Sequence, residues 1–113
     1  MDVAMIRADQ VLTHVKLSGR MDVEGIQRNG LEFTEQVAGA GVNAVVDMSL
    51  VTFMSSIGMR LVLDSSRKLN SKGARLVLLG PRGMVAESLR IARVGDIIPI
   101  VEDLGEALAL LAP

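Results

Sequence analysis

The sequence contains no cysteine, tryptophan or tyrosine, and it has a single histidine. Without cysteine the chain can form neither a disulfide framework nor a thiolate metal site. One histidine, His14, cannot supply a histidine-rich ligand set, so we expect no zinc site and no cofactor. Because His14 falls on the more polar side of a predicted strand, we expect its side chain at the surface.

The net charge is close to zero, and aromatic residues are also few. Lys and Arg together number 12 and Asp and Glu 13, which gives a formal net charge of −1. Nucleic-acid-binding proteins usually carry a basic footprint and aromatic side chains on which bases stack. The only aromatic residues here are Phe33 and Phe53. Nucleic acid is therefore not an expected partner.

Long apolar runs are missing as well. No run approaches the roughly 20 residues that a helix needs to span a bilayer. The first residues, Met1–Arg7, lack the basic-then-apolar order of a secretory signal. We therefore expect no direct membrane insertion and a cytoplasmic location.

Hydrophobic residues make up half of the 113 residues. This is the length of one domain, and no repeat, linker or low-complexity tract divides it. We therefore predict a single domain over residues 1–113. Its core must be built from Val, Leu, Ile, Met and Ala, because aromatic residues are so few.

Hydrophobic periodicity predicts the element order β-β-α-β-α-β-α-β-α. The first two strands form a hairpin, and strands and helices then alternate, which favours an α/β fold with a mostly parallel sheet and helices packed on it. The predicted strands are 3–7, 11–17, 44–48, 75–79 and 97–101, and the predicted helices begin at Asp22, Ser56, Pro81 and Asp103 and end near Ala40, Ser71, Gly95 and Leu111.

Two serines, Ser55 and Ser56, stand together where the second predicted helix begins, and Gly58 follows them. The first backbone N–H groups of a helix lack partners, and the helix dipole is positive there. A phosphate is easily accommodated at such a position. Taken alone, however, the pattern is more typical of an N-cap and its neighbour, because serine is a favoured cap.

Residues 47–60 read Asp-Met-Ser-Leu-Val-Thr-Phe-Met-Ser-Ser-Ile-Gly-Met-Arg and resemble the signature of the STAS domain, the family of anti-sigma factor antagonists. Residues 18–22, Ser-Gly-Arg-Met-Asp, resemble the Gly-x-Leu-Asp turn of that family. Residues 92–100 and the following Glu106-Ala107-Leu108 resemble its C-terminal pattern. The three segments stand in the family's order, so the resemblance covers nearly the whole chain.

The resemblance implies a phosphorylatable binding module that regulates transcription and is not an enzyme. In this family the partner is a serine kinase that is itself the anti-sigma factor, and a phosphoserine phosphatase resets the switch. The kinase phosphorylates the first hydroxyl after an acidic position, which falls on Ser56 here. Ser55 stands where the family usually has aspartate, and Ile57 stands where it has a second hydroxyl. The site therefore lacks one negative charge beside the acceptor.

Four residues are expected to flank the acceptor: Ser55, Gly58, Asp22 and Asp47. Asp22 matches the turn aspartate of the family, which is expected near the acceptor after folding, but a helix N-cap explains it equally well. Asp47 ends a predicted strand. We expect it to form structural hydrogen bonds, and to orient the loop that carries the serines, rather than to take part in catalysis.

A partner-binding patch is predicted on the flank of the second helix, beside Ser56. Met59, Leu63, Ser66 and Asn70 share this flank at helical spacing. Apolar residues in such a place favour contact with a partner. The same residues can equally pack under a neighbouring helix.

Two other functions remain open. STAS domains also serve in membrane transporters and lipid-transport complexes, so the chain can be a separate subunit that docks on a membrane complex. The third function is a small enzyme or ligand binder that uses the crevice at the strand ends. No convincing base, metal-ligand set or nucleotide loop supports it, since residues 80–83, Gly-Pro-Arg-Gly, lack the ending that a P-loop requires.

Overall fold

The computed structural model describes residues 1–113 and has a five-stranded sheet in the order β1-β2-β3-β4-β5. The first two strands form an antiparallel hairpin, and each later strand runs parallel to its neighbour. The strands are β1 (Asp2–Ala8), β2 (Leu12–Met21), β3 (Asn43–Met54), β4 (Leu76–Leu79) and β5 (Ile100–Val101).

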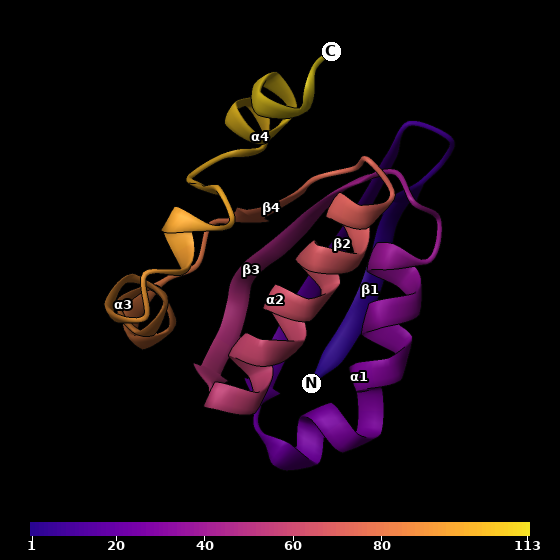
Figure 1. Ribbon diagram of the computed structural model, residues 1–113. Coiled ribbons are helices and arrows are strands. Elements are labelled where there is room, and N and C mark those ends of the chain that lie inside the picture. Colours follow the sequence, from indigo (N-terminus) through magenta and orange to yellow (C-terminus); the bar gives the residue numbers. More distant parts are fainter.

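Three helices connect the parallel strands and cover one face of the sheet, as Figure 1 shows for α1 and α2 lying side by side. A fourth helix packs against the opposite face over β4 and β5. The helices are α1 (Val23–Ala38), α2 (Ser56–Ser71), α3 (Gly83–Ile91) and α4 (Leu104–Leu111), and a short 3-10 helix, η1 (Val94–Asp96), follows α3. No helix combines the length and the apolar character that a membrane span requires.

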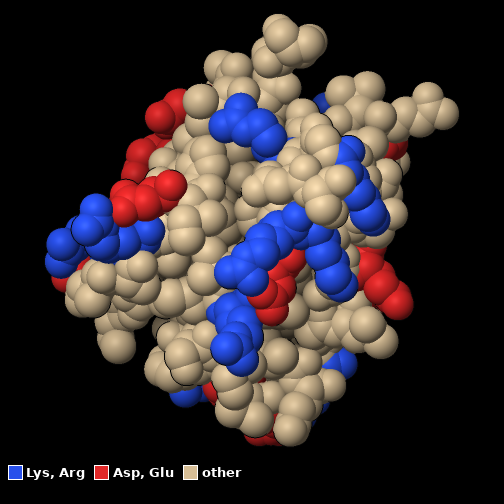
Figure 2. All heavy atoms as spheres, viewed as in Figure 1, with Lys and Arg blue, Asp and Glu red and all other residues tan.

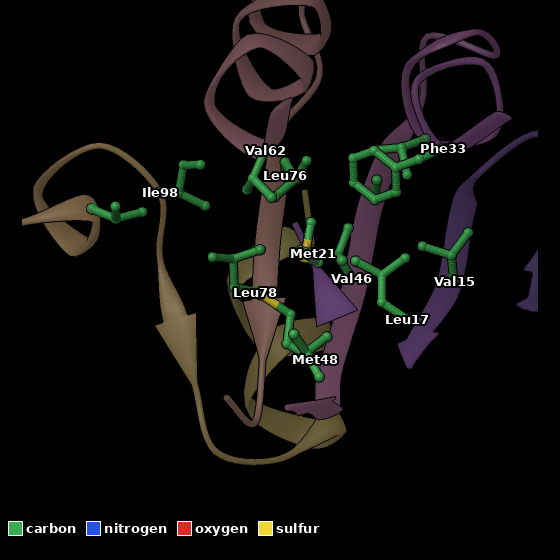
Figure 3. Close-up of a cluster of buried hydrophobic side chains, with 14 of the residues drawn as sticks. Val15, Leu17, Met21, Phe33, Val46, Met48, Val62, Leu76, Leu78 and Ile98 are labelled. Carbon is green, nitrogen blue, oxygen red and sulfur yellow. The ribbon is translucent and has the colours of Figure 1, made fainter. Parts of the chain in front are cut away.

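The main core lies between the sheet and the first three helices. It contains 20 buried hydrophobic residues, of which Phe33 is the only aromatic one. Side chains from neighbouring strands meet there in alternating positions, and α1 and α2 contribute Phe33 and Val62 (Figure 3). Burial of this kind stabilises the fold by about 25 cal/mol per Å² of apolar surface removed from water. It thereby holds the parallel strand ends, and the loops that follow them, in fixed positions.

The element order and the α/β class predicted from the sequence are confirmed, and α2 has the predicted bounds. Three strands differ from the prediction. β2 continues to Met21 instead of ending at Leu17. β3 continues to Met54 because its second half pairs with the end of β2, in a register that places Met21 beside Met54. The last strand is reduced to two residues, because the preceding segment forms η1 and sends Ile98 into the core.

His14 was expected at the surface, and this prediction is wrong. The residue is only 9% exposed, because it lies on the face of the sheet that carries the second buried cluster, with Leu12 and Val45. Its register partners are Arg7 on β1 and Val45 on β3. Its Nε2 atom is buried without a hydrogen-bond partner, and burial lowers the pKa of the imidazole.

A candidate phosphorylation site at the start of helix α2

Ser55 is the N-cap of α2. Its Oγ accepts a hydrogen bond from the backbone N–H of Gly58 at 3.2 Å and donates one to the carbonyl oxygen of Met21 at 2.9 Å. The backbone N–H of Ser55 donates to the same carbonyl at 3.0 Å. The Ser55 side chain is therefore fully engaged, and it joins the first turn of α2 to the end of β2.

Gly58 allows this first turn to approach β2 closely. A Cβ atom at this position would lie 2.7 Å from the carbonyl oxygen of Met21 and 2.9 Å from the Met21 Cβ. Both distances are too short for carbon, so any larger residue would displace the helix. Gly58 therefore contributes to the packing of the helix, and its role toward the acceptor stays a prediction.

Ser56 is the first residue of α2 and is exposed to solvent. Its hydroxyl is not used in any hydrogen bond within the protein, in contrast to that of Ser55. It opens onto a shallow hollow of about 230 Å³ that Met59, Arg60 and Leu63 also line. Ser56 is thus an accessible hydroxyl on a fixed helical turn, which is the geometry that a phosphoryl-transfer enzyme needs in its substrate.

The exposed side of α2 carries more positive than negative charge. Figure 2 shows the Lys and Arg side chains that gather over this helix, with acidic atoms between them. Arg60, Arg67 and Lys68 are exposed, and Asp64 is the acidic residue, with its Oδ1 3.4 Å from the Arg67 Nη1. Arg60 forms no salt bridge and lies four residues after Ser56, on the same face of the helix. A negative charge on Ser56 would therefore be attracted by the guanidinium of Arg60.

Asp22 is the N-cap of α1, which is one of the two roles predicted for it. Its Oδ1 accepts from the backbone N–H of Gly25 at 2.9 Å, and its Oδ2 accepts from Arg20 Nε at 3.1 Å. These hydrogen bonds lower the pKa of the Asp22 carboxyl. Asp22 directly follows Met21, whose carbonyl holds Ser55, so it belongs to the same strand-end loop. No contact with Ser56 is formed, and a role toward the acceptor stays a prediction.

Arg20 and Phe53 also lie at this end of the sheet, and neither was predicted to belong to the site. They are register partners on β2 and β3, and the Arg20 guanidinium carbon lies 4.3 Å from the centre of the Phe53 ring. Such a cation–π contact fixes the arginine over the strand end. Only the strand register brings the two residues together, so the sequence carried no local signal for the pair.

Asp47 does not flank the acceptor, which corrects the prediction. The residue lies in the middle of β3, eight residues before Ser55, which corresponds to about 26 Å of extended strand. Its Oδ1 accepts a hydrogen bond from the backbone N–H of Ser49 at 2.9 Å. The structural hydrogen bond is therefore present, but it does not orient the loop that carries the serines.

The predicted partner-binding patch is only partly exposed. Met59 and Leu63 line the hollow beside Ser56 and are also partly buried against the core, so both of their predicted roles are compatible with the structure. Ser66 is only 3% exposed and is absent from this hollow. It therefore cannot contribute to an exposed patch around Ser56.

The family model described as the STAS domain matches residues 3–107. This chain therefore belongs to the STAS domain family. No curated protein matches the chain by sequence.

Several solved structures share the fold at low sequence identity. An anti-sigma-factor antagonist (STAS) domain protein from Planctomyces limnophilus is 16% identical, with a TM-score of 0.84 and complete coverage of both chains. The Bacillus cell fate determinant SpoIIAA in its phosphorylated form is 18% identical, with a TM-score of 0.70 over 97% of this chain and 99% of that one. In its unphosphorylated form it is described as an anti-sigma factor antagonist and matches with 17% identity and a TM-score of 0.77, over 96% of each chain.

The murine anion transporter Slc26a9 contains a similar fold. The match has 15% identity and a TM-score of 0.70, and it covers 88% of this chain but 17% of the transporter. The STAS fold therefore occurs both as an independent chain and as a small part of a much larger protein.

Proposed function

We propose that this chain is an anti-sigma factor antagonist, a binding module that sequesters a serine-kinase anti-sigma factor and so frees a sigma factor. It acts by binding and performs no catalysis of its own. Phosphorylation of Ser56 switches the binding off. The observation that carries the proposal is the difference between the two serines. The Ser55 hydroxyl is hydrogen-bonded to Met21 and Gly58, whereas the Ser56 hydroxyl is exposed and forms no hydrogen bond within the protein.

The acceptor needs only to be accessible and well positioned. In phosphoryl transfer the kinase supplies the metal ion and the nucleotide, so the substrate chain provides the attacking hydroxyl. The free Ser56 hydroxyl on the first turn of α2 meets this requirement. The serine at position 55 replaces the aspartate that is usual in the family, and its hydroxyl still performs the capping that a carboxylate there would perform.

The switch is a local change of charge. A phosphate adds roughly −1.5 to −2 charges at neutral pH. The positive end of the α2 dipole and the free guanidinium of Arg60 favour that charge, so the fold is retained. A partner surface that presents acidic or apolar groups to Ser56, Met59 and Leu63 does not tolerate it, and the complex dissociates.

The two solved forms of SpoIIAA support this proposal, because that protein was described both with and without phosphorylation on the same fold. A cycle of this kind also requires an enzyme that removes the phosphate. We therefore include a phosphoserine phosphatase among the partners, together with the kinase and its ATP.

In a second candidate function, the same domain binds a different kind of partner. The fold match within the murine anion transporter favours a role as a subunit that regulates a membrane transport or lipid-transport complex. Co-purification of the chain with a permease, and no binding to a kinase, would favour this second function.

The test is incubation of the chain with its cognate kinase and ATP, followed by mass spectrometry of the peptide that carries both serines. We expect one phosphate, on Ser56. The Ser56→Ala variant should remain unmodified, whereas Ser55→Thr, which keeps a capping hydroxyl, should still be phosphorylated. A phosphate on position 55, or none on either residue, would contradict the proposal.

A further inference from the structure

The candidate acceptor lies at one end of a charged stripe on the exposed side of α2. Residues three or four apart follow one another along one side of a helix. The residues with this spacing are Ser56, Arg60, Asp64 and Arg67, and together they are called the α2 stripe. All four are exposed, and Figure 2 shows Lys and Arg side chains along the length of this helix. A partner that contacts Ser56 therefore also meets this stripe.

Arg60 is the charged member of the α2 stripe that has no partner within the chain. Asp64 and Arg67 pair with each other at 3.4 Å, whereas the Arg60 guanidinium forms no salt bridge. An exposed arginine on the neighbouring helix α1 differs, because Arg28 pairs with Glu24 at 2.7 Å. A guanidinium has five N–H donors in a planar arrangement that matches a carboxylate or a phosphate. Those of Arg60 are available to an anionic group from outside the chain.

The hollow of about 230 Å³ beside Ser56 places apolar surface next to this charge. Met59 and Leu63 line it together with Arg60, and both hydrophobic side chains also pack against the core. Sites for drug-sized ligands measure roughly 300–1,000 Å³, so this hollow suits a single side chain of a partner better than an organic ligand. An apolar side chain that enters it brings the neighbouring surface of the partner against Arg60.

The arrangement of charge on α2 favours a protein surface over an anionic membrane. Membranes attract continuous clusters of about four to eight Lys or Arg residues. Here Asp64 stands between Arg60 and Arg67, and Glu35 of α1 lines a neighbouring hollow together with Lys68. A uniformly anionic lipid surface would be repelled by both carboxylates. A protein surface can place a carboxylate opposite Arg60 and a neutral or basic group opposite Asp64.

We propose that Arg60 exchanges one anionic partner for another when the switch operates. In the unmodified chain its guanidinium binds a carboxylate on the surface of the kinase, which also inserts an apolar side chain between Met59 and Leu63. In the phosphorylated chain the phosphate on Ser56, one helical turn away, binds the guanidinium instead. This inference rests on the proposed function, and it adds the acidic chemistry of the partner surface and the residue that reads it.

The exchange gives phosphorylation two effects on binding. The phosphate repels the carboxylate of the partner, and it also occupies the cation that this carboxylate used. With repulsion alone, the effects of phosphorylating Ser56 and of replacing Arg60 would add, because neither change would alter the other. With the exchange, replacing Arg60 weakens binding of the unmodified chain but changes binding of the phosphorylated chain very little. The two mechanisms therefore differ in a measurable coupling.

Contact between Arg60 and the phosphate is tested by ³¹P nuclear magnetic resonance of the whole chain, with phosphoserine installed at position 56 by synthesis. The second pKa of a phosphoserine is about 6, and a nearby guanidinium lowers it because the dianion is favoured. In Arg60→Gln this pKa should be about 0.2–0.4 higher. Arg67→Gln is the control, since it removes the same charge about 16 Å further along the helix. An unchanged pKa in Arg60→Gln, or an equal rise in Arg67→Gln, would overturn the exchange.

Contact between Arg60 and an acidic partner is tested with a defined peptide, acetyl-Glu-Glu-Leu-Glu-Glu-amide, added to the ¹⁵N-labelled chain at low ionic strength. We expect saturable shifts of the backbone amides of Arg60, Leu63 and Asp64. Arg60→Gln should weaken binding about threefold, as expected for an exposed ion pair, and Arg28→Gln on α1 should not change it. In the chain with phosphoserine at position 56, Arg60→Gln should have no further effect. Equal affinity of the unmodified chain and its Arg60→Gln variant, or an equal loss in Arg28→Gln, would refute the acidic partner.

Vesicles of phosphatidylglycerol and phosphatidylcholine are the competing probe. Binding that depends on Arg60 with these vesicles, and not with the peptide, would overturn the assignment of a protein partner. Arg60 is exposed and has no salt bridge, so its replacement should leave the fold intact. Neither measurement uses a kinase, so failure of the exchange is distinguishable from failure of the proposed function, which the phosphorylation of Ser56 tests separately.

Discussion

The Ser55 hydroxyl donates a hydrogen bond to the carbonyl oxygen of Met21 at 2.9 Å, and the backbone N–H of Ser55 donates to the same oxygen at 3.0 Å. This double contact joins the end of β2 to the first turn of α2. Ser55 is thus the structural member of the serine pair, and Ser56 is the member that remains free for modification.

Replacing Ser55 by alanine should destabilise the protein. The variant loses the cap to Gly58 and the side-chain hydrogen bond to Met21, so we expect a loss of about 1–2 kcal/mol in the free energy of unfolding. Ser56→Ala removes no hydrogen bond and should change that free energy by less than about 0.5 kcal/mol. Urea unfolding of both variants checks the difference. Equal effects would show that Ser55 does not have the structural role assigned to it.

Gly58→Ala should be more disruptive than an ordinary glycine replacement. The added carbon would lie 2.7 Å from the Met21 carbonyl oxygen, so α2 must shift away from β2. We expect a loss of about 1–3 kcal/mol, typical of overpacking. Gly95→Ala is the control, because its added carbon meets no atom closer than 3.8 Å. Thermal unfolding measures both, and an unaffected Gly58→Ala variant would contradict the close approach.

A negative charge at position 56 should stabilise the fold. Ser56→Asp places a carboxylate at the positive end of the α2 dipole, which is worth about 0.3–1 kcal/mol at low ionic strength. Part of the gain should come from Arg60, four residues further on, since such pairs contribute about 0.2–0.5 kcal/mol. The gain should therefore shrink in the Ser56→Asp, Arg60→Gln double variant. If the aspartate instead destabilises the protein, the folded chain does not tolerate a negative charge at position 56.

Stability should fall as the pH drops below about 6.5, because of His14. Burial lowers the pKa of the folded imidazole, Asp47 opposes that effect and Lys16 adds to it, while Arg7 is the register partner on β1. The unfolded chain, with an imidazole pKa of about 6.5, binds the proton more readily, so stability rises with pH across this window. Urea unfolding from pH 5 to 8 measures the slope. His14→Gln should flatten it, and an unchanged slope would assign the dependence to other groups.

Much of the fold follows from local patterns in the sequence. The bounds of α2 were predictable because a capping serine, a helical apolar stripe and the closing Lys72-Gly73 all agree. Asp22 was predictable as an N-cap for the same kind of reason. The mostly parallel direction of the strands after the hairpin followed from the alternation of strands and helices.

The remaining features depend on contacts between distant segments. The bond from Ser55 to Met21 exists only because β3 extends far enough to lie beside the end of β2. Ser66 shares a helix flank with the partly exposed Met59 and Leu63 and is nevertheless buried. His14 is buried because its face of the sheet carries a second buried cluster, with Leu12 and Val45. Periodicity within one segment describes which residues share a face, but it does not describe what covers that face.

The most direct test of the switch is the affinity of the kinase partner for the unmodified chain and for the chain phosphorylated on Ser56, measured by isothermal titration calorimetry. Ser56→Asp serves as a stable substitute, and a pull-down with both forms identifies the partner that binds only the unmodified chain. We predict tight binding of the unmodified chain and at least about a tenfold loss on phosphorylation, which corresponds to 1.4 kcal/mol. Equal affinity of the two forms would contradict a charge switch at Ser56.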